Sequence, residues 1–134
     1  MSTDQQIEQE IQAKGPTAPR ITPADIEASI ASEHYFTAKD GAEGAHLRNS
    51  PHFNGTPVPD GLNLLTFCVL VLRNGTKIVG INYGPVSPEN FDAKMARDEA
   101  RKNALEQIWP LLGYELRTRL RGMKGPLTAG SDGA

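Results

Sequence analysis

The chain has 134 residues, of which 38% are hydrophobic and 22% charged, and its net charge is −2. This length and composition fit one globular domain, and so weak a charge gives no reason to expect nucleic acid or a membrane surface as the main partner. A single cysteine, Cys68, excludes an internal disulfide framework, and no stretch has the apolar length of a membrane span or the apolar core of a signal peptide.

The first segment, residues 1–20, is polar and ends in GPTAPR. Within it, only Ile7 and Ile11 are spaced for one helical face, and so short a helix is marginally stable on its own. We therefore predict a mobile arm at residues 1–20. Residues 125–134 are mostly Gly and small residues and are predicted to be a disordered tail, which leaves one domain over residues 21–124.

A helix is predicted to begin at Thr22, which suits the N-cap position and precedes Pro23, a residue favoured in the first helical turn. Ile26 and Ile30 are four residues apart, so they would lie on one face. This spacing predicts an amphipathic helix that continues to about Phe36.

A long loop and a β-hairpin are predicted next. Residues 38–61 are dominated by Gly, Pro, Ser and Asn, and a loop of this length is usually functional or disordered. Strands are predicted at about residues 64–73 and 76–83. The Asn-Gly pair at residues 74–75 favours a type I′ turn, in which both central residues have positive φ. Gly80 in the second strand indicates that another element packs close to the backbone.

A second helix is predicted to begin at Ser87 and Pro88 and to end at Pro110. One side of it is bulky, and the opposite side carries only small residues, at Ala93, Ala96, Ala100 and Ala104. A final short helix with a basic outer face is predicted from three leucines that recur every four residues, namely Leu112, Leu116 and Leu120.

Together these elements predict an α+β fold in which the hairpin packs with an N-terminal helix, a long C-terminal helix and a short final helix. A lone hairpin is unstable in water, and the first strand is apolar on both faces. Either the first and last helices cover both faces within one chain, or a second copy supplies the missing layer. We favour self-association. The expected oligomer interface comprises Cys68, Leu70, Ala93, Ala96, Ala100 and Ala104.

No combination of side chains typical of an active site is present, and we expect a non-enzymatic protein without a cofactor or a metal site. A histidine, two tyrosines and a basic C-terminal part are the candidates for binding a ligand or a partner. The alternative is that they have no binding role: the histidine then lies at the end of a helix, and the basic residues belong to a solvated surface that carries both charges. These candidates are His34, Tyr35, Tyr114, Arg117, Arg119 and Arg121.

Three blocks of the chain are similar to one protein family. They are ITPADIEASIASEHYFTA, LLTFCVLVLRNGTKIVG and SPENFDAKMARDEARKNALEQIWPLLGYELRTRL. It is a small tailed-phage family named after gene product 49 of one phage and gene product 66 of another, and the resemblance covers about residues 21–120. The resemblance implies a phage or prophage gene that is expressed in the bacterial cytoplasm and is accessory rather than part of the virion. The family has no established general activity, so no catalytic residue is carried over.

Three functions follow as hypotheses. The first is a non-enzymatic accessory protein that self-associates and binds or modulates a host component, as in counter-defence or host takeover. The second is an oligomeric sponge for a nucleotide or another small anion. The third is nucleic-acid binding through the basic C-terminal part, whose signature is a steep salt dependence. The sequence leaves open the host target or ligand, the number of copies, the role of residues 38–61 and any active site formed between chains.

Overall fold

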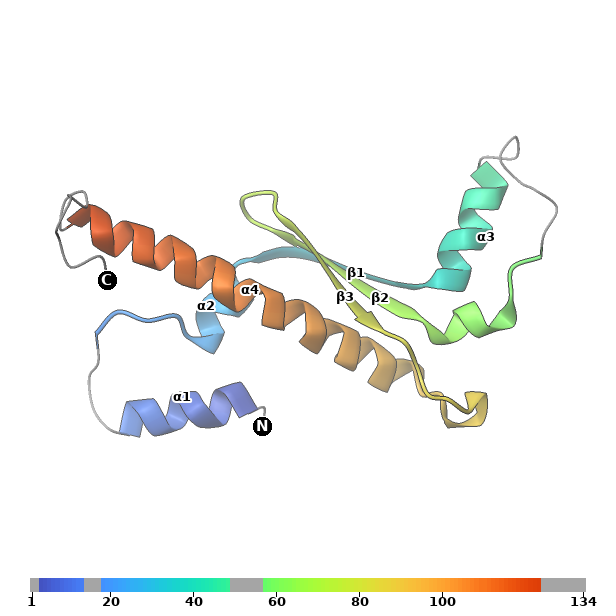
Figure 1. The fold of residues 1–134 in the computed structure, drawn as a ribbon, viewed down its shortest axis with the longest axis horizontal. Coiled ribbons are helices and arrows are strands. Elements are labelled where there is room, and N and C mark those ends of the chain that lie inside the picture. Colours follow the sequence, from blue (N-terminus) through green and yellow to red (C-terminus); the bar gives the residue numbers. More distant parts are fainter. Residues whose placement is uncertain (1–2, 14–17, 49–56, 124–134) are drawn as a thin grey trace, which may run out of the picture. The chain divides into compact units, whose positions relative to one another are not determined.

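The computed structural model describes residues 3–13, 18–48 and 57–123. They fall into two units: Ser29–Gln107, called the sheet unit below, and Met1–Ala28 with Ile108–Ala134, called the terminal unit. The elements in chain order are α1 (Thr3–Ala13), α2 (Pro23–Ala28), β1 (Ile30–Thr37), α3 (Ala38–Arg48), η2 (Asp60–Leu64), β2 (Thr66–Leu72), β3 (Lys77–Asn82), η3 (Pro88–Asn90) and α4 (Ala93–Met123) (Figure 1). The predicted α+β class is confirmed.

The sheet unit is built on an antiparallel sheet with strand order β1-β2-β3, so β2 is central. The predicted β2–β3 hairpin is confirmed, but its turn is not type I′. The Leu72 N–H donates to the Thr76 carbonyl at 2.8 Å, and the Gly75 N–H donates to the Leu72 carbonyl at 2.9 Å. Gly75 has a φ of 91°, and no described residue other than glycine has a positive φ. The loop therefore has three residues with one left-handed position, which glycine fills without strain.

The helix predicted to run to Phe36 is wrong in its second half. Its start is confirmed, because the Asp25 N–H donates to Thr22 Oγ1 at 3.2 Å and the Thr22 N–H donates to Asp25 Oδ2 at 2.9 Å. This helix, α2, ends at Ala28, and residues 30–37 form β1. β1 contains an isoleucine, two aromatic residues and a threonine, and it pairs with β2 along most of its length. Pairing with a distant strand thus overrides the local helical spacing.

The loop predicted at residues 38–61 contains a helix, α3. Thr37 and Asp40 cap its first turn reciprocally, with both N–H to side-chain distances at 3.1 Å. Two glycines inside α3 lower its helix propensity, which is why composition favours a loop. Residues 49–56 and the predicted tail at 125–134 lie outside the described residues. Within the predicted arm, Thr3–Ala13 form α1.

The two predicted C-terminal helices are one helix, α4. It begins later than predicted, because Asp92 is its N-cap: Asp92 Oδ1 accepts a hydrogen bond from the Met95 N–H at 3.1 Å. Pro88 belongs instead to the short η3 turn. Pro110 lies inside α4. A proline there removes one main-chain hydrogen bond, and the good helix formers on both sides allow the helix to continue.

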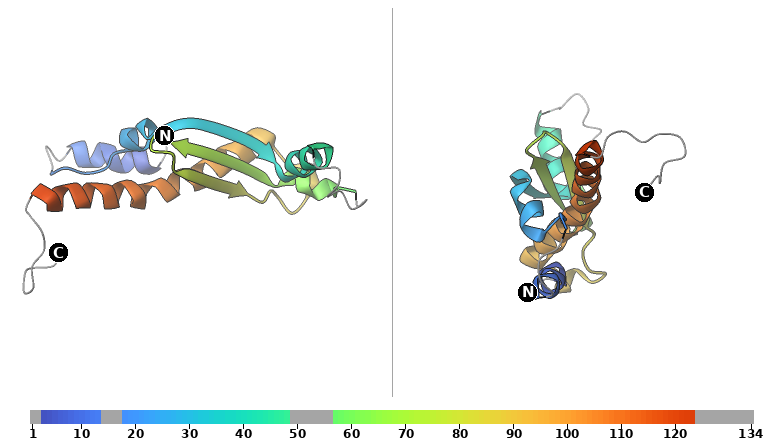
Figure 2. Two further views of the ribbon diagram at one scale, coloured as in Figure 1. Left: turned by 90° about the horizontal axis from the view of Figure 1, so that it is seen from above. Right: turned by 90° about the vertical axis from the view of Figure 1, so that its left-hand side faces the viewer.

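The part of α4 that belongs to the sheet unit runs along one face of the sheet (Figure 2). Its alanines Ala96, Ala100 and Ala104 are buried there. A Cβ added to Gly80 would clash with the Ala100 carbonyl oxygen and lie 2.6 Å from the Ala104 nitrogen. The close approach predicted at Gly80 is thereby confirmed. Alternate residues of β2 face α4 and are buried.

The predicted oligomer interface requires a correction. Most of its members are buried between α4 and the sheet within a single chain, so they are covered without a second copy. These residues are Cys68, Leu70, Ala96, Ala100 and Ala104. Only Ala93 is exposed. The alanine side of α4 therefore serves packing inside the sheet unit.

Candidate functional site

The face of the sheet that turns away from α4, called the open face below, is largely apolar. The strand pairing places on it alternate residues of all three strands, namely Ser32, His34, Phe36, Phe67, Val69, Val71, Lys77, Val79 and Ile81. Val79 is 43% exposed and Phe36 is 40% exposed. The open face therefore offers apolar side chains to solvent at its two outer strands.

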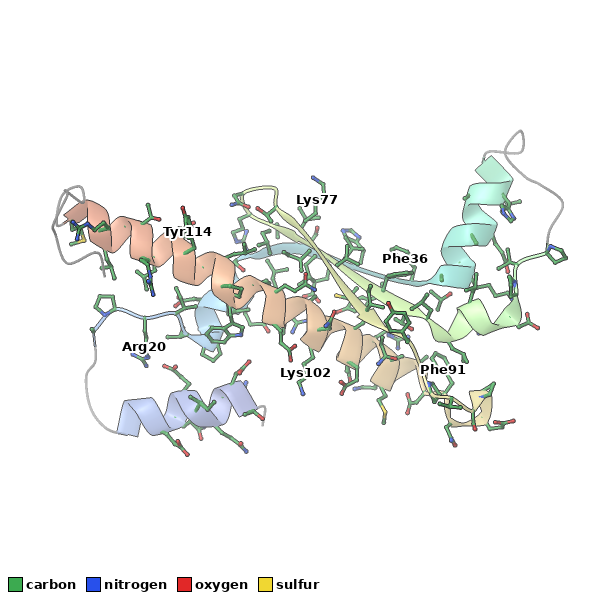
Figure 3. All side chains as sticks on the ribbon, viewed as in Figure 1. Arg20, Phe36, Lys77, Phe91, Lys102 and Tyr114 are labelled. Atoms are coloured by element: carbon green, nitrogen blue, oxygen red, sulfur yellow. The ribbon has the colours of Figure 1, made fainter. Side chains whose placement is uncertain are left out.

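One end of the open face is aromatic and aliphatic, with Phe36, Phe67 and Ile81 side by side, and the other end is more polar, with Ser32 and Lys77. The rings of Phe36 and Phe67 lie with their centroids 5.5 Å apart at an interplanar angle of 38°. Such tilted pairs add to the stability gained from burial alone. Gly41 of α3 lies beside the Phe36 ring. In Figure 3, Lys77 and Lys102 project in opposite directions, the first from the hairpin and the second from α4.

The opposite side of β1 carries an ion pair with α4. The Arg101 guanidinium donates to both carboxylate oxygens of Glu33, at 2.9 and 3.2 Å. The Tyr35 hydroxyl donates to the same carboxylate at 2.8 Å. Because Glu33 and Tyr35 lie two residues apart, they share this face, whereas His34 points to the open face, with a ring nitrogen 3.1 Å from Ser32 Oγ. The candidate residues His34 and Tyr35 are therefore on opposite faces and do not form one site.

These contacts change the acidity of three groups. Hydrogen bonding to Arg101 lowers the pKa of Glu33 below its ordinary value of 4.5, although burial acts in the other direction. Burial, together with the bond to Glu33, raises the pKa of Tyr35. Burial also raises the pKa of the Cys68 thiol. At neutral pH the phenol and the thiol therefore keep their protons, and neither group is prepared to act as a nucleophile or a base.

The outer edge of β3 is hydrogen-bonded to side chains of α4. Gln107 Nε2 donates to the Val79 carbonyl at 2.7 Å, and the Ile81 N–H donates to Asn103 Oδ1 at 3.0 Å. Two amide side chains from one helix thus satisfy the main-chain groups that an edge strand leaves exposed. No sequence pattern predicts this role, because Asn103 and Gln107 stand out only as polar positions on an exposed helix face.

A cavity of about 260 Å³ lies in the sheet unit between the end of β1, η2 and the start of α4. Its lining combines aromatic and polar residues with one arginine: Tyr35, Phe36, Thr37, Asp40, Asn63, Thr66, Phe91, Ala93 and Arg97. Among the described residues, no ion pair or hydrogen bond is formed by the Arg97 side chain. Its guanidinium is therefore available to an anion, although the Asp40 carboxylate in the same lining weakens the positive potential.

The remaining candidates lie in the terminal unit. Tyr114, Arg117 and Arg119 are exposed on α4, and Arg121 is half-buried. The Tyr114 carbonyl accepts a hydrogen bond from the Thr118 hydroxyl at 3.0 Å. A second cavity of about 260 Å³ lies in this unit and is lined by Asp4, Ile7, Glu8, Ile21, Pro23 and Trp109. None of the four predicted residues lines that cavity, and the exposed Arg117 and Arg119 form a solvated basic surface of α4.

In the part of the chain that the structure describes, no three His, Cys, Asp or Glu side chains gather as ligands for a metal ion. The same residues include no helix long and apolar enough to cross a membrane.

Comparison with known protein families gives a match over most of the chain. Residues 21–120 match the family model described as the phage protein (N4 Gp49/phage Sf6 gene 66) family, which confirms the resemblance seen in the sequence blocks. No curated protein and no solved structure matches the chain.

Proposed function

Since the chain belongs to the phage protein (N4 Gp49/phage Sf6 gene 66) family, we propose that it acts in the cytoplasm of the infected bacterium as a non-enzymatic accessory protein. It associates with itself and binds and modulates a host component. The observation that carries this proposal is the open face, where Val79 and Phe36 are 43% and 40% exposed.

Burial of the open face would contribute substantial free energy. A Val or Phe side chain that is fully buried stabilises a structure by about 1.5–3 kcal/mol. Val69 and Val71 at the centre of the face are half-buried, and the outer positions Phe36 and Val79 retain more exposed area. Contiguous apolar patches of this kind commonly mark sites of protein association.

A binding role rather than catalysis is also supported by the contacts and protonation of three side chains that could otherwise react, namely Glu33, Tyr35 and Cys68. Glu33 is held in a bidentate contact with Arg101. Tyr35 and Cys68 both have raised pKa values, so they stay neutral at physiological pH. These three side chains are therefore committed to packing and hydrogen bonding between β1, β2 and α4.

Sizing chromatography with light scattering on the full chain tests self-association. We expect an oligomer for the wild type and a loss of mass for Val79→Glu, because a carboxylate on the apolar face cannot be buried without a partner. Lys77→Glu is the matched control, since it places the same group on the same face and strand at a position that is already charged. A wild type that stays monomeric at all concentrations would contradict the proposal.

A second candidate is a binding protein for a small anion, such as a nucleotide. It is favoured by the cavity of the sheet unit, where Arg97 lies in one lining with the aromatic residues Tyr35 and Phe91. Arginine binds carboxylate and phosphate groups through parallel hydrogen bonds, and aromatic rings offer surfaces for a planar group.

A thermal-shift panel of nucleotides and simpler anions tests this candidate. A ligand that binds the native state stabilises it by RT ln(1 + [L]/Kd) and so raises the melting temperature. We expect Arg97→Gln to abolish the shift and Arg119→Gln to preserve it, because both remove one charge and only Arg97 lines the cavity. A shift that depends on Arg119 rather than Arg97 would move the site to the basic surface of α4.

A further inference from the structure

The outer edge of β1 differs from that of β3. The Ala38 N–H donates to the Leu65 carbonyl at 2.9 Å, and hydrogen-bonded pairs alternate along an antiparallel ladder. The main-chain groups of His34 and Phe36 therefore bond to β2, and those of Glu33 and Tyr35 point outward. Among the described residues, the N–H and carbonyl groups of Glu33 and Tyr35 have no hydrogen-bond partner.

From Ser32 to Thr37, β1 also lacks the usual features that keep an edge strand from pairing, and its one irregularity lies before Ser32. Proteins protect such edges with proline, lysine, an unpaired inward charge or a covering element. The sequence of β1, IASEHYFT, contains no proline, glycine or lysine. Its one acidic residue, Glu33, is neutralised by Arg101. The four residues from Glu33 to Phe36 are exposed, so a second strand can approach this edge.

We propose that β1 pairs antiparallel with β1 of a second copy of the chain. Glu33 of each copy lies opposite Tyr35 of the other, and the two His34 residues face each other on the two-fold axis. This register rests on the proposed self-association and adds to the open face a second contact between copies, at the edge of the sheet. In this register, the Glu33 N–H of one strand donates to the Tyr35 carbonyl of the other, and the Tyr35 N–H donates to the Glu33 carbonyl.

The neighbouring register is less favourable. If Tyr35 lay opposite Tyr35 of the second copy, Glu33 would lie opposite Thr37. The Thr37 N–H is already bonded to Asp40 at 3.1 Å, so that ladder could form in full only by breaking the cap of α3. At the other end of β1, the register shifts between Ile30 and Ser32. Such a bulge bends a strand and limits regular pairing, which leaves residues 33–35 as the pairing segment.

The pairing joins the sheets of two copies into one continuous sheet. The two open faces then become one surface, with Phe36 of each copy near its centre rather than at an edge. A second copy is favoured over an unrelated strand because the segment is self-complementary under a two-fold axis, which is the commonest symmetry of small oligomers. Each outward group in one copy finds its counterpart in the other.

Cysteine cross-linking tests the register. In the proposed ladder the two His34 residues form a non-hydrogen-bonded pair with Cα atoms about 4.5 Å apart, which is within the range that a disulfide spans. His34→Cys should therefore give a disulfide-linked dimer under mild oxidation. Ser32→Cys is the matched control on the same face, because its two copies would be about 13 Å apart. The native Cys68 is buried and does not interfere.

Amide hydrogen exchange on the full wild-type chain provides a second readout that needs no variant. The N–H groups of Glu33 and Tyr35 should exchange at least about tenfold more slowly when the protein concentration is raised above the dissociation constant. Those of His34 and Phe36 should be protected at every concentration, because they bond to β2.

The outcomes separate this inference from the proposed function. An oligomer that cross-links through His34→Cys and protects Glu33 and Tyr35 supports both. An oligomer that cross-links through Val79→Cys and not through His34→Cys overturns the edge pairing and leaves association through the open face. Protection of Glu33 and Tyr35 at all concentrations assigns the edge to a segment of the same chain and also overturns the pairing. A monomer overturns both proposals.

Discussion

Arg101 on α4 reaches across to β1 and holds Glu33 with two hydrogen bonds, at 2.9 and 3.2 Å. The contact ties residues 68 positions apart in the sequence. It also holds the Glu33 carboxylate where the Tyr35 hydroxyl can donate a hydrogen bond to it. One ion pair therefore fixes the geometry of the edge strand relative to the helix that covers the sheet.

The Glu33 contact should make stability depend on pH in the acid range. Because the folded-state pKa of Glu33 lies below its ordinary value of 4.5, its contribution is fully present above about pH 4.5 and is lost as the pH falls through the folded pKa. We expect Glu33→Gln to lower the free energy of unfolding by about 0.5–1 kcal/mol at pH 7. Urea unfolding from pH 7 to pH 3 measures this, and the gap between variant and wild type should narrow below about pH 4.5. A gap that stays constant would contradict the assignment.

Gly80→Ala should destabilise the sheet unit strongly. The added methyl would lie 2.6 Å from the Ala104 nitrogen and 2.7 Å from its Cβ, so α4 would have to move off the sheet. Overpacking of this kind costs about 1–3 kcal/mol or more. Gly44→Ala is the matched control, because nothing lies within 4 Å of its added methyl and alanine favours a helix by about 0.5–1 kcal/mol. Equal effects of the two changes in urea unfolding would show that α4 does not pack closely on Gly80.

Asn103→Ala should expose the outer edge of β3. The Ile81 N–H loses its acceptor at 3.0 Å and becomes available to water, so its amide exchange should accelerate while that of Ile78 on the inner side does not change. The cost in stability should be about 0.5–1.5 kcal/mol, since the site is exposed and water replaces the acceptor. Glu106→Ala, a change of another polar residue on α4, serves as the control. If the Ile81 amide exchanges at the wild-type rate, the side chain does not cap the edge.

Thr37→Ala should loosen the start of α3. It removes the hydroxyl that accepts the Asp40 N–H at 3.1 Å, and loss of an N-cap typically costs about 1 kcal/mol. Thr37→Ser should retain most of the stability because it keeps the hydroxyl. Helical circular dichroism and the exchange of the Asp40 amide measure the effect. An alanine variant that matches the serine variant would argue against the cap.

Local signals in the sequence are sufficient to predict the position of the β2–β3 hairpin and the start of α2. The Asn-Gly pair and the Thr22–Asp25 spacing each act within a few residues, so neighbouring residues alone determine the turn and the helix start. Gly80 is also predictable, because a glycine inside a strand usually marks a close approach. The same kind of signal is present at Thr37 and Asp40 but is outweighed by the glycines that follow.

Non-local contacts decide what the sequence does not predict. The helical spacing of Ile26 and Ile30 extends into β1, and only its pairing with β2 makes that segment a strand. The apolar residues of β2 suggest that a second chain covers one face, whereas the alanine side of α4 covers the face that carries Cys68 and Leu70. The surfaces proposed for association are therefore the open face and the edge of β1, and not the alanine side of α4 that the sequence favours.

Cys68 is the only cysteine of the chain, and it is fully buried beneath α4 with a raised thiol pKa. A thiol reagent can reach it only when α4 and the sheet separate, because the reactive thiolate needs both solvent access and deprotonation. The native protein thus contains its own reporter for the opening of the sheet unit. The rate at which the thiol is labelled measures how often helix and sheet part, and any ligand or second copy that stabilises the unit should slow that rate.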